Sequence, residues 1–469
     1  MSPKGNFEPN GNPSSPLDNC LVAFRLEPVR YHSLSSARQL KIEEIKYTWD
    51  TNSPEVLSDL TILESEYFPD DLVILKTRSA SHRSLVNSMR GGPAEKSSIL
   101  HFQHSFGCGC FGADECCVDE EGNRIEELSP DILNELEGGL NSGKEKEIIV
   151  AVLDTGIVAE LIPSEYLWVN PDVENAAELI GDTTSGVHGR NFVVDPEPQV
   201  QTRDGIRYLG DPVTMDLRDE HPQLHGTMMA AYIINQFRNS EYAVKIMVLK
   251  THNANGLGNL DDIYRAIHYA KYYGAHFINA SWAFPATDPE SYSILKDVIQ
   301  RDLAKAGTMM VTVSGNVYME DPTRKFYPAK FGKRSDHPAM GVMVAATVSK
   351  DKTHVSPSEA RSNLFVDFGV PCDREIGERY VFSLPLGTES GSPCYLQGSS
   401  VACAVATGFL AAKLPQMLFD HKPARSKLGV LEYGDAAMFS NSSALAEGVI
   451  GGRVLNLSNG EVQTLGDNG

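Results

Sequence analysis

The sequence lacks any long apolar run. Its longest apolar stretch, Val401 to Ala412, has twelve residues and contains Thr407 and Gly408, whereas a membrane-spanning helix needs about 20 apolar residues. The N-terminus begins MSPKGNFEPN and has no apolar segment of the kind that a secretory signal peptide carries. We therefore expect neither a membrane span nor a signal peptide.

Cysteine and positive charge are also scarce. Eight cysteines among 469 residues are too few for a disulfide scaffold. With no visible signal peptide, they favour a reducing setting, in the cytoplasm or elsewhere inside the cell. There are 41 Lys and Arg residues against 62 Asp and Glu, so the formal net charge is −21. Such an acidic chain has no bulk attraction for nucleic acid or an anionic membrane, and we expect neither as a partner.

The remaining composition is that of a globular protein. Changes in composition along the chain divide it into four segments. Residues 1–18 are rich in Pro, Gly, Asn and Ser and are expected to be disordered. Residues 19–118 form an N-terminal region of unknown fold. Residues 119–146 are strongly acidic and punctuated by glycine, and we interpret them as an exposed linker. Residues 147–469 form a second domain, in which the character of the sequence changes.

Two predictions concern the secondary structure of the N-terminal region, and one concerns its cysteines. The run Leu72 to Leu75 predicts a buried strand, and Glu55 to Tyr67 predicts a helix. A cluster of potential metal ligands comprises His101, His104, Cys108, Cys110, Cys116 and Cys117. Thiolates and imidazoles can bind zinc, but these spacings match no common zinc pattern. We favour a reduced loop over a metal site or a redox role, and expect no metal and no cofactor.

The domain from residue 147 alternates between strands and helices. The continuous apolar run Ile148 to Leu153 is typical of a strand buried on both faces of a parallel sheet. Further strands are predicted at 243–249, 276–281, 309–313 and 342–348, and helices at 225–237, 259–273, 289–306 and from about 399. This alternation predicts an α/β fold with a doubly wound parallel sheet, in which ligands bind at the carboxyl ends of the strands.

Three polar residues stand where such a sheet places its chemistry. Asp154 directly follows the first apolar strand, in VAVLDTGI, and His225 opens a helix in LHGTMMAAYII. Ser400 opens another helix in QGSSVACAVATG. A serine becomes a nucleophile when a histidine takes its proton and a carboxylate orients that histidine. The chain order Asp, His, Ser is the one found in subtilisin.

These motifs resemble those of the subtilisin-like serine proteases (subtilases, family S8). The matching strings are Asp-Thr-Gly at Asp154, His-Gly-Thr at His225 and, approximately, Gly-Thr-Ser-Met-Ala around Ser400. The resemblance covers about 147–420 and implies a subtilisin-like fold with Asp154, His225 and Ser400 as a catalytic triad. It further implies that Asn316, which ends VTVSGN, donates a hydrogen bond to the oxyanion. It also suggests peptide-binding segments at Ser281, Trp282 and Ala283, at Gly258, and at Ser314 and Gly315.

Alternatives exist for each catalytic residue. The Asp-Thr-Gly string also occurs in aspartic proteases, but a single-chain enzyme of that kind needs a second copy, and none is present. His188 and His221 compete with His225, although neither precedes Gly-Thr. Ser399 competes with Ser400, and a helix N-cap is the common role for such a serine. An α/β-hydrolase arrangement fails because the acid and then the histidine would have to follow the serine.

The predicted function is a serine endopeptidase that acts on peptide or protein substrates through an acyl-enzyme. The alternative is a catalytically weak pseudoprotease or peptide-binding module with the same fold. We expect the N-terminal region to restrain the peptidase by covering the peptide-binding edge near Ser281 and Trp282, or to bind a partner. Asp182, Asp211 and Asp219 lie among polar residues and are interpreted as solvated surface rather than calcium ligands.

Overall fold

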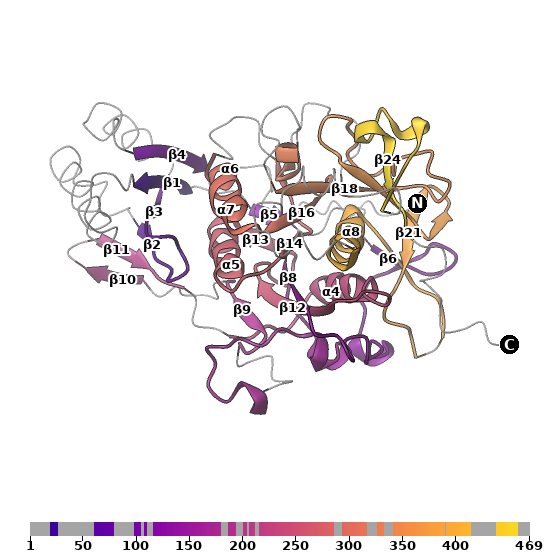
Figure 1. Ribbon diagram of the computed structural model, residues 1–469, viewed down its shortest axis with the longest axis horizontal. Coiled ribbons are helices and arrows are strands. Elements are labelled where there is room, and N and C mark those ends of the chain that lie inside the picture. The colour runs from indigo at the N-terminus through magenta and orange to yellow at the C-terminus, as the bar shows by residue number, and fades with distance from the viewer. Residues whose placement is uncertain are drawn as a thin grey trace, which may run out of the picture.

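The fold is built on a nine-stranded sheet with the order β23-β24-β19-β18-β16-β14-β8-β12-β9 (Figure 1). This computed structural model describes residues 19–26, 61–78, 98–104, 107–109, 116–179, 186–193, 200–203, 206–211, 215–285, 293–316, 326–332, 341–389, 391–413 and 438–457. The strands are β8 (Glu147–Asp154), β9 (Gly189–Asn191), β12 (Ala243–Lys250), β14 (Phe277–Ala280), β16 (Met309–Val313), β18 (Val342–Val348), β19 (Phe368–Pro371), β23 (Phe439–Asn441) and β24 (Arg453–Leu455). All neighbours pair in parallel except β23 and β24.

Helices cover both faces of this sheet. On one side lie α4 (His225–Asn235) and α8 (Ser399–Lys413), and on the other α5 (Leu260–Tyr272), followed by one continuous helix formed by α6 (Ser293–Asp297), the π-helical turn η8 (Val298–Leu303) and α7 (Ala304–Ala306) (Figure 1). Each side has its own buried apolar cluster. Strands such as β16 and β18 are buried along their whole length because both of their faces are covered. The predicted doubly wound parallel sheet is therefore confirmed.

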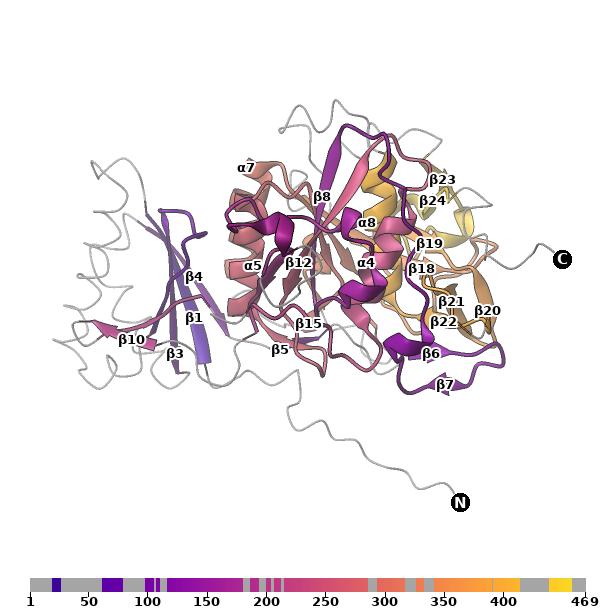
Figure 2. The ribbon, with the colours of Figure 1, turned by 90° about the horizontal axis from the view of Figure 1, so that it is seen from below.

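A second sheet of six strands lies beyond α5 (Figure 2). Its order is β10 (Val200–Arg203), β11 (Ile206–Leu209), β2 (Thr61–Leu63), β3 (Leu72–Arg78), β1 (Asn19–Leu26) and β4 (Ser98–His104). Aromatic contacts join the loop between β2 and β3 to α5: the ring centroids of Phe68 and His268 are 5.1 Å apart, and those of Tyr67 and Tyr269 are 4.7 Å apart. The N-terminal region thus has its own sheet, which two strands from beyond residue 147 complete.

The structure differs from two expectations for this part of the chain. The strand predicted at Leu72 to Leu75 is present as β3, but the predicted helix at Glu55 to Tyr67 is wrong over Thr61–Leu63, which form strand β2. Leu63 packs in the same apolar cluster as α5, and Ile62 is buried as well; this packing outweighs local helix propensity. Residues 51–60 and 1–18 lie outside the described residues, as do residues 27–50.

Three smaller sheets join distant segments. The five-stranded sheet has the order β20 (Arg374–Ile376), β21 (Arg379–Ser383), β22 (Tyr395–Gln397), β6 (Cys116–Val118) and β7 (Arg124–Ile125). The two-stranded sheets pair β13 (Leu257–Asn259) with β5 (Gly107–Gly109), and β15 (Phe284–Pro285) with β17 (Phe326–Tyr327). The short helical turns are η3 (Pro130–Ile132), η4 (Ala159–Leu161), η5 (Ser164–Tyr166), η6 (Ala176–Glu178), η9 (Ala329–Gly332), η11 (Ser443–Leu445) and η12 (Ile450–Gly452).

The acidic stretch at 119–146 packs more closely than an exposed linker would. Leu128, Leu133 and Leu136 are buried in the same apolar cluster as α4 and α8. The backbone N–H of Leu128 donates to Pro222 O at 2.8 Å, and that of Leu136 donates to Leu161 O at 2.9 Å. Its acidic residues lie mostly on the outer side.

Among the described residues, no helix is long and apolar enough to cross a membrane.

Candidate active site

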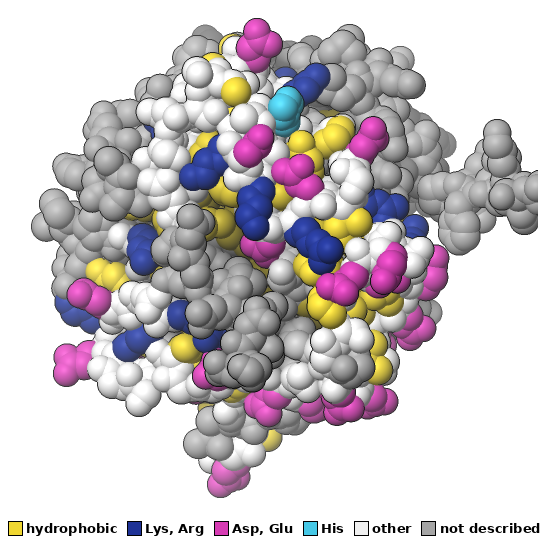
Figure 3. Space-filling model, turned by 90° about the vertical axis from the view of Figure 1, so that its right-hand side faces the viewer, with side chains coloured by type: hydrophobic (Ala, Val, Ile, Leu, Met, Phe, Trp, Pro, Cys, Tyr) yellow, Lys and Arg dark blue, Asp and Glu magenta, His cyan; other side chains and the backbone are white. Residues whose placement is uncertain are grey.

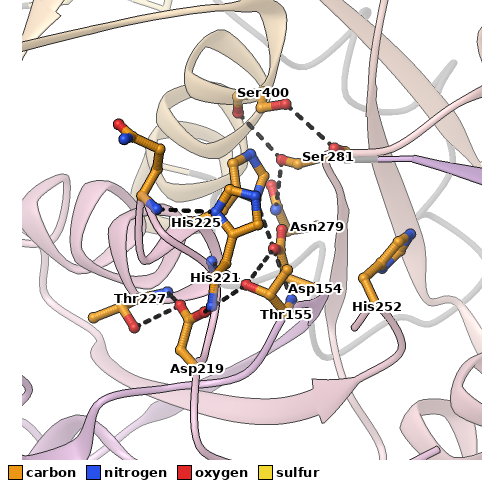
Figure 4. A network of polar contacts seen from close by, with 12 residues as sticks. Asp154, Thr155, Asp219, His221, His225, Thr227, His252, Asn279, Ser281 and Ser400 are labelled. Atoms are coloured by element: carbon orange, nitrogen blue, oxygen red, sulfur yellow. Dashed lines mark hydrogen bonds and ion pairs between the residues drawn. The ribbon is translucent and has the colours of Figure 1, made fainter. Parts of the chain in front are cut away.

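The sheet and two helices bring Asp154, His225 and Ser400 together. Asp154 is the last residue of the interior strand β8, His225 is the first residue of α4, and Ser400 lies in the first turn of α8. All three are only 1% exposed. Figure 4 shows the ring of His225 between the carboxylate of Asp154 and Ser400. The three motifs, distant in sequence, therefore meet at one end of the parallel strands.

The contact between Asp154 and His225 is short and buried. Oδ1 of Asp154 lies 2.6 Å from Nδ1 of His225 and also accepts the Thr155 N–H at 2.8 Å. Burial alone would raise the pKa of Asp154, but the nearby imidazole of His225 and the hydrogen bonds hold it below its ordinary value. The carboxylate is therefore charged at neutral pH and fixes the His225 ring through Nδ1, with Nε2 directed away from Asp154.

A second carboxylate, Asp219, supports the start of α4. Its Oδ2 accepts the backbone N–H of Thr227 at 2.9 Å and the Thr227 hydroxyl at 2.8 Å. The Thr155 hydroxyl donates to Asp219 Oδ1 at 2.8 Å and accepts the N–H of Gly226 at 2.9 Å. Burial raises the pKa of Asp219, although the hydrogen bonds from Thr227 and Thr155 favour its charged form. Asp219 thus caps the helix that presents His225 and links it to the strand that presents Asp154.

Asp219 is one of the residues that the sequence predicted to be solvated, and that prediction is wrong because Asp219 is only 4% exposed. The hydroxyls of the Asp-Thr-Gly and His-Gly-Thr motifs, Thr155 and Thr227, are both buried beside Asp154 and His225. Two such hydroxyls need an acceptor. The two threonine hydroxyls are therefore the feature of the sequence that indicates a buried carboxylate near His225.

A glycine in each motif lets the strand and helix approach. A Cβ added to Gly226 would lie 2.4 Å from Gly156 O, and one added to Gly156 would lie 2.3 Å from Leu217 O. Gly156 also has a φ of 123°, a left-handed conformation that favours glycine. These glycines bring the loop after Asp154 against the first turn of α4.

Ser400 is paired with the backbone after strand β14. Its hydroxyl donates to Ser281 O at 3.2 Å, and the Ser281 hydroxyl donates to Ser400 O at 3.1 Å. Asn279 Nδ2 donates to the Ser281 hydroxyl at 2.9 Å, and Asn279 Oδ1 accepts from Thr407 of α8 at the same distance. This network fixes the first turn of α8, and with it the nucleophile candidate, relative to the sheet.

Asn316 and Ser399 form the other side of the site. Oδ1 of Asn316 accepts the Ser399 hydroxyl at 2.6 Å and the Ser399 N–H at 3.1 Å. Both bonds end on the carbonyl oxygen of the side chain, so its Nδ2 amide is the group oriented for a further acceptor. Ser399 therefore touches Asn316, whereas Ser400 lies beside Ser281. This arrangement suits a donor for a developing oxyanion.

The competing histidines have other environments. His188 is fully buried and its Nδ1 lies 2.9 Å from Trp168 O. The His221 ring centroid lies 6.1 Å from that of His225, and burial and the charge of His225 lower the pKa of His221 to about 4. His252 donates its backbone N–H to Asp154 O at 3.1 Å, and burial lowers its pKa to about 4. His221 and His252 are thus neutral neighbours of the Asp154–His225 pair.

The predicted peptide-binding residues are distributed around Ser400. Ser281 and Trp282 are buried, whereas Ala283 is partly exposed. Ser314 is buried, and Gly315 O accepts the Ala360 N–H at 2.8 Å. Gly258 lies in β13, whose edge pairs with β5 in the register Gly258↔Cys108. The strand edge at Gly258 is therefore occupied by the N-terminal region, while Trp282 supports the site from within the core.

No metal centre is visible in the part of the chain that the structure describes. There, no group of three or more His, Cys, Asp or Glu side chains converges on one point. Of the cysteine cluster, Cys117 is a buried thiol that forms no disulfide. The side chains of His101, His104, Cys108, Cys110 and Cys116 lie outside the described residues.

Comparison with known proteins concerns the family and the fold. The model of the subtilase family (peptidase S8) matches residues 145–420. No curated protein matches. Among solved structures, the epidermin leader peptide processing serine protease EpiP from Staphylococcus aureus is 15% identical with a TM-score of 0.52, over 94% of this chain and 97% of that one. A mutant of EpiP is 13% identical with a TM-score of 0.51, over 94% and 98%. These structural likenesses concern the fold.

Proposed function

Because the chain belongs to the subtilase family, a family of serine peptidases, we propose that it is a serine endopeptidase that hydrolyses peptide bonds through an acyl-enzyme. The observation that carries this proposal is the buried 2.6 Å contact between Asp154 and His225 beside the first turn of α8, where Ser400 lies. The substrate class is a peptide or a protein. No cofactor takes part in the proposed reaction.

The first half of the proposed reaction forms the acyl-enzyme. Ser400 Oγ attacks the carbonyl carbon while His225 Nε2 takes its proton, and the ionised Asp154 stabilises the resulting imidazolium through Nδ1–H. The carbonyl oxygen becomes an oxyanion that accepts a hydrogen bond from Asn316 Nδ2. The C–N bond then breaks, and the departing amine receives the proton from His225.

The second half of the reaction returns the free enzyme. Water attacks the acyl carbon, His225 takes a proton from that water, and a second oxyanion forms at the same position. When the ester bond breaks, Ser400 recovers a proton from His225 and the acid product leaves. Asp154 stays ionised throughout because its pKa lies below its ordinary value.

We further propose that the N-terminal region restrains this activity. A peptide substrate binds an exposed strand edge through backbone hydrogen bonds, and the edge of β13 is already paired with β5. Lys76 on β3 of the N-terminal sheet donates to Asp261 on α5 at 2.9 Å, which ties that sheet to the peptidase domain. The restraint thus occupies backbone partners of the substrate at β13, rather than at Ser281 and Trp282 as the sequence suggested, and leaves the catalytic residues unchanged.

The proposal is tested by incubating an unstructured protein substrate with the full chain, and with a chain carrying Lys76→Glu, which sets two carboxylates against each other. We expect hydrolysis by the Lys76→Glu chain to exceed that by the full chain, and to be lost when Ser400→Ala is added. Binding of peptides without hydrolysis in every variant would instead favour a non-catalytic peptide-binding module.

A further inference from the structure

The strand edge that leads into the catalytic serine is also occupied by the chain itself. Strand β22 ends at Gln397, three residues before Ser400, and β6 pairs with it antiparallel in the register Gln397↔Cys116, Leu396↔Cys117 and Tyr395↔Val118. β22 therefore has β6 on one edge and β21 on the other. A substrate could form backbone hydrogen bonds with β22 on this edge only if it displaced β6.

Strand β6 is anchored by buried side chains. Cys117 and Val118 are 0% exposed. Val118 packs with Val381 and Tyr395 of the same sheet, whereas Cys117 belongs to the large apolar cluster under α4 and α8. Displacing β6 would expose both side chains to water, which is unfavourable.

Gln223 ties the same segment to the loop that leads into His225. Its Oε1 accepts the N–H of Cys117 at 3.2 Å, and its Nε2 donates to Ile125 O at 3.0 Å and to Glu126 O at 2.6 Å. Leu128 follows with a backbone hydrogen bond to Pro222 O. A segment 117–128 is thus held between the strand before Ser400 and the loop before His225.

Further contacts hold the outer part of this segment. Arg379 donates to Gly122 O at 2.9 Å, and the Arg374 side chain lies 3.4 Å from that of Glu120. The face of the molecule that carries these strands shows Lys and Arg side chains beside Asp and Glu side chains over its centre, and Asp and Glu side chains along its lower right margin (Figure 3). Segment 117–128 is therefore integrated into this face at several points.

The two occupied edges lie on different sides of helices α4 and α8, whose first turns carry His225 and Ser400. Figures 1 and 2 both place β5 to one side of helices α4 and α8 and β6 to the other. The acyl part of a peptide is expected along β13, where β5 now lies. The part of the peptide that leaves after attack by Ser400 must then extend in the direction of β22 and β6.

We propose that segment 117–128 is a built-in occupant of the leaving-group side of the site. This inference rests on the proposed peptidase function and narrows it: the enzyme prefers bonds that are followed by few residues, close to the C-terminal end of a peptide. The N-terminal sheet and β5 control the acyl side, whereas β6 limits the leaving-group side. Substrates with long leaving groups require β6 to separate from β22.

The test uses the full chain with Lys76→Glu and three substrates that share the same mixed tetrapeptide acyl part. One carries p-nitroanilide, one carries a single residue after the scissile bond, and one carries four. We expect the four-residue substrate to have a kcat/KM at least about tenfold below the other two. Equal kcat/KM values for all three would overturn the inference while supporting the peptidase function.

Two substitutions examine whether segment 117–128 causes the difference. Gln223→Glu removes the donors to Ile125 O and Glu126 O without changing side-chain size, and Arg379→Ala removes the contact to Gly122 O. In both variants the rate of p-nitroanilide hydrolysis should stay the same. The difference in kcat/KM between the four-residue substrate and the other two should become smaller, and the decrease should be larger in Gln223→Glu than in Arg379→Ala. If the difference in kcat/KM between the substrates is unchanged in both variants, the inference is overturned.

Hydrogen exchange of the same samples provides a readout other than activity. We expect the amides of Cys117 and Val118 to remain protected in the parent chain and to exchange faster in Gln223→Glu. Rapid exchange in the parent would show that β6 leaves readily and would overturn the inference. Failure of the peptidase function is seen separately, as absence of both p-nitroanilide hydrolysis and fluorophosphonate labelling at Ser400, and it would remove the premise as well.

Discussion

The hydroxyl of Ser399 lies 2.6 Å from Oδ1 of Asn316 and holds the side-chain amide of Asn316 in one orientation. The two residues come from the start of α8 and from the loop after β16, and they are 83 positions apart in sequence. Adjacent serines therefore have different environments: Ser399 orients the side chain of Asn316, which we propose as the oxyanion donor, and Ser400 lies beside Ser281 and His225.

Removing the oxyanion donor should lower the rate of the chemical step. We expect Asn316→Ala to reduce kcat by about 10²–10³, the effect of losing one such donor in subtilisin, with little change in KM. Steady-state kinetics on a p-nitroanilide peptide measure this. A kcat within about twofold of the parent would show that Asn316 makes no contribution to the transition state.

Ser399 is expected to act as a positioning residue through Asn316. Ser399→Ala retains the backbone N–H bond to Asn316 and should lower kcat by about tenfold with KM unchanged. Ser399→Thr restores a hydroxyl at the same position and should recover most of the loss. In an Asn316→Ala background, Ser399→Ala should have little further effect, and full additivity of the two changes would contradict the proposed role.

Asp219 should be important for stability as well as activity. Asp219→Ala leaves the buried Thr227 N–H and the Thr155 hydroxyl without their acceptor, and we expect it to lower the free energy of unfolding by about 3 kcal/mol. Glu220→Ala is the matched control, because Glu220 is exposed and its ion pair with Lys250 contributes under about 1 kcal/mol. Urea denaturation of the two variants compares them, and similar losses would argue against the capping role.

The buried histidines predict how stability depends on pH. Burial lowers the folded-state pKa of His252 from 6.5 to about 4, so between those values the unfolded chain binds a proton that the folded chain does not. Stability should therefore fall as the pH falls from about 6.5 to about 4, by up to on the order of 3 kcal/mol from this residue. His252→Gln should flatten that slope. Identical slopes for His252→Gln and the parent would contradict this.

The N-terminal restraint predicts different outcomes for two truncated chains. A chain beginning at Cys116 lacks β1 to β5 but keeps the buried Cys117, Leu128, Leu133 and Leu136, and it should hydrolyse peptides faster than the full chain. A chain beginning at Gly143 also loses those four apolar side chains and should unfold at a lower temperature. Equal activity of the Cys116 chain and the full chain, both folded, would contradict the restraint.

Much of the peptidase fold could be predicted from local sequence. Runs such as Ile148 to Leu153 are typical of a strand buried on both faces, and the helix of Leu260, Ile263 and Ile267 has one apolar face. Asp154, His225 and Ser400 could be located because each stands at the end of a strand or the start of a helix next to a recurring short motif. Their convergence is a consequence of parallel topology, which carries all strand ends to one edge.

The remainder depended on contacts between distant segments. The pairing of β5 with β13 and of β6 with β22 joins short strands that carry no pattern of their own, so their sequence does not indicate a partner. The acidic composition at 119–146 reflects the exposed residues of this stretch. It gives no indication that three leucines in the same stretch pack into the apolar core. Asp219 lies among polar residues in the sequence, which suggests a solvated position, whereas its burial depends on Thr155 and Thr227, which lie on other elements.

The most direct test of the account is to identify the nucleophile by labelling the chain with a fluorophosphonate and mapping the modified peptide. The account predicts that the label is attached to Ser400 in the Lys76→Glu chain, that Ser400→Ala abolishes labelling, and that Ser399→Ala retains it. Labelling that persists in Ser400→Ala, or that is lost in Ser399→Ala while the protein stays folded, would contradict the assignment of Ser400 as the residue that forms the acyl-enzyme.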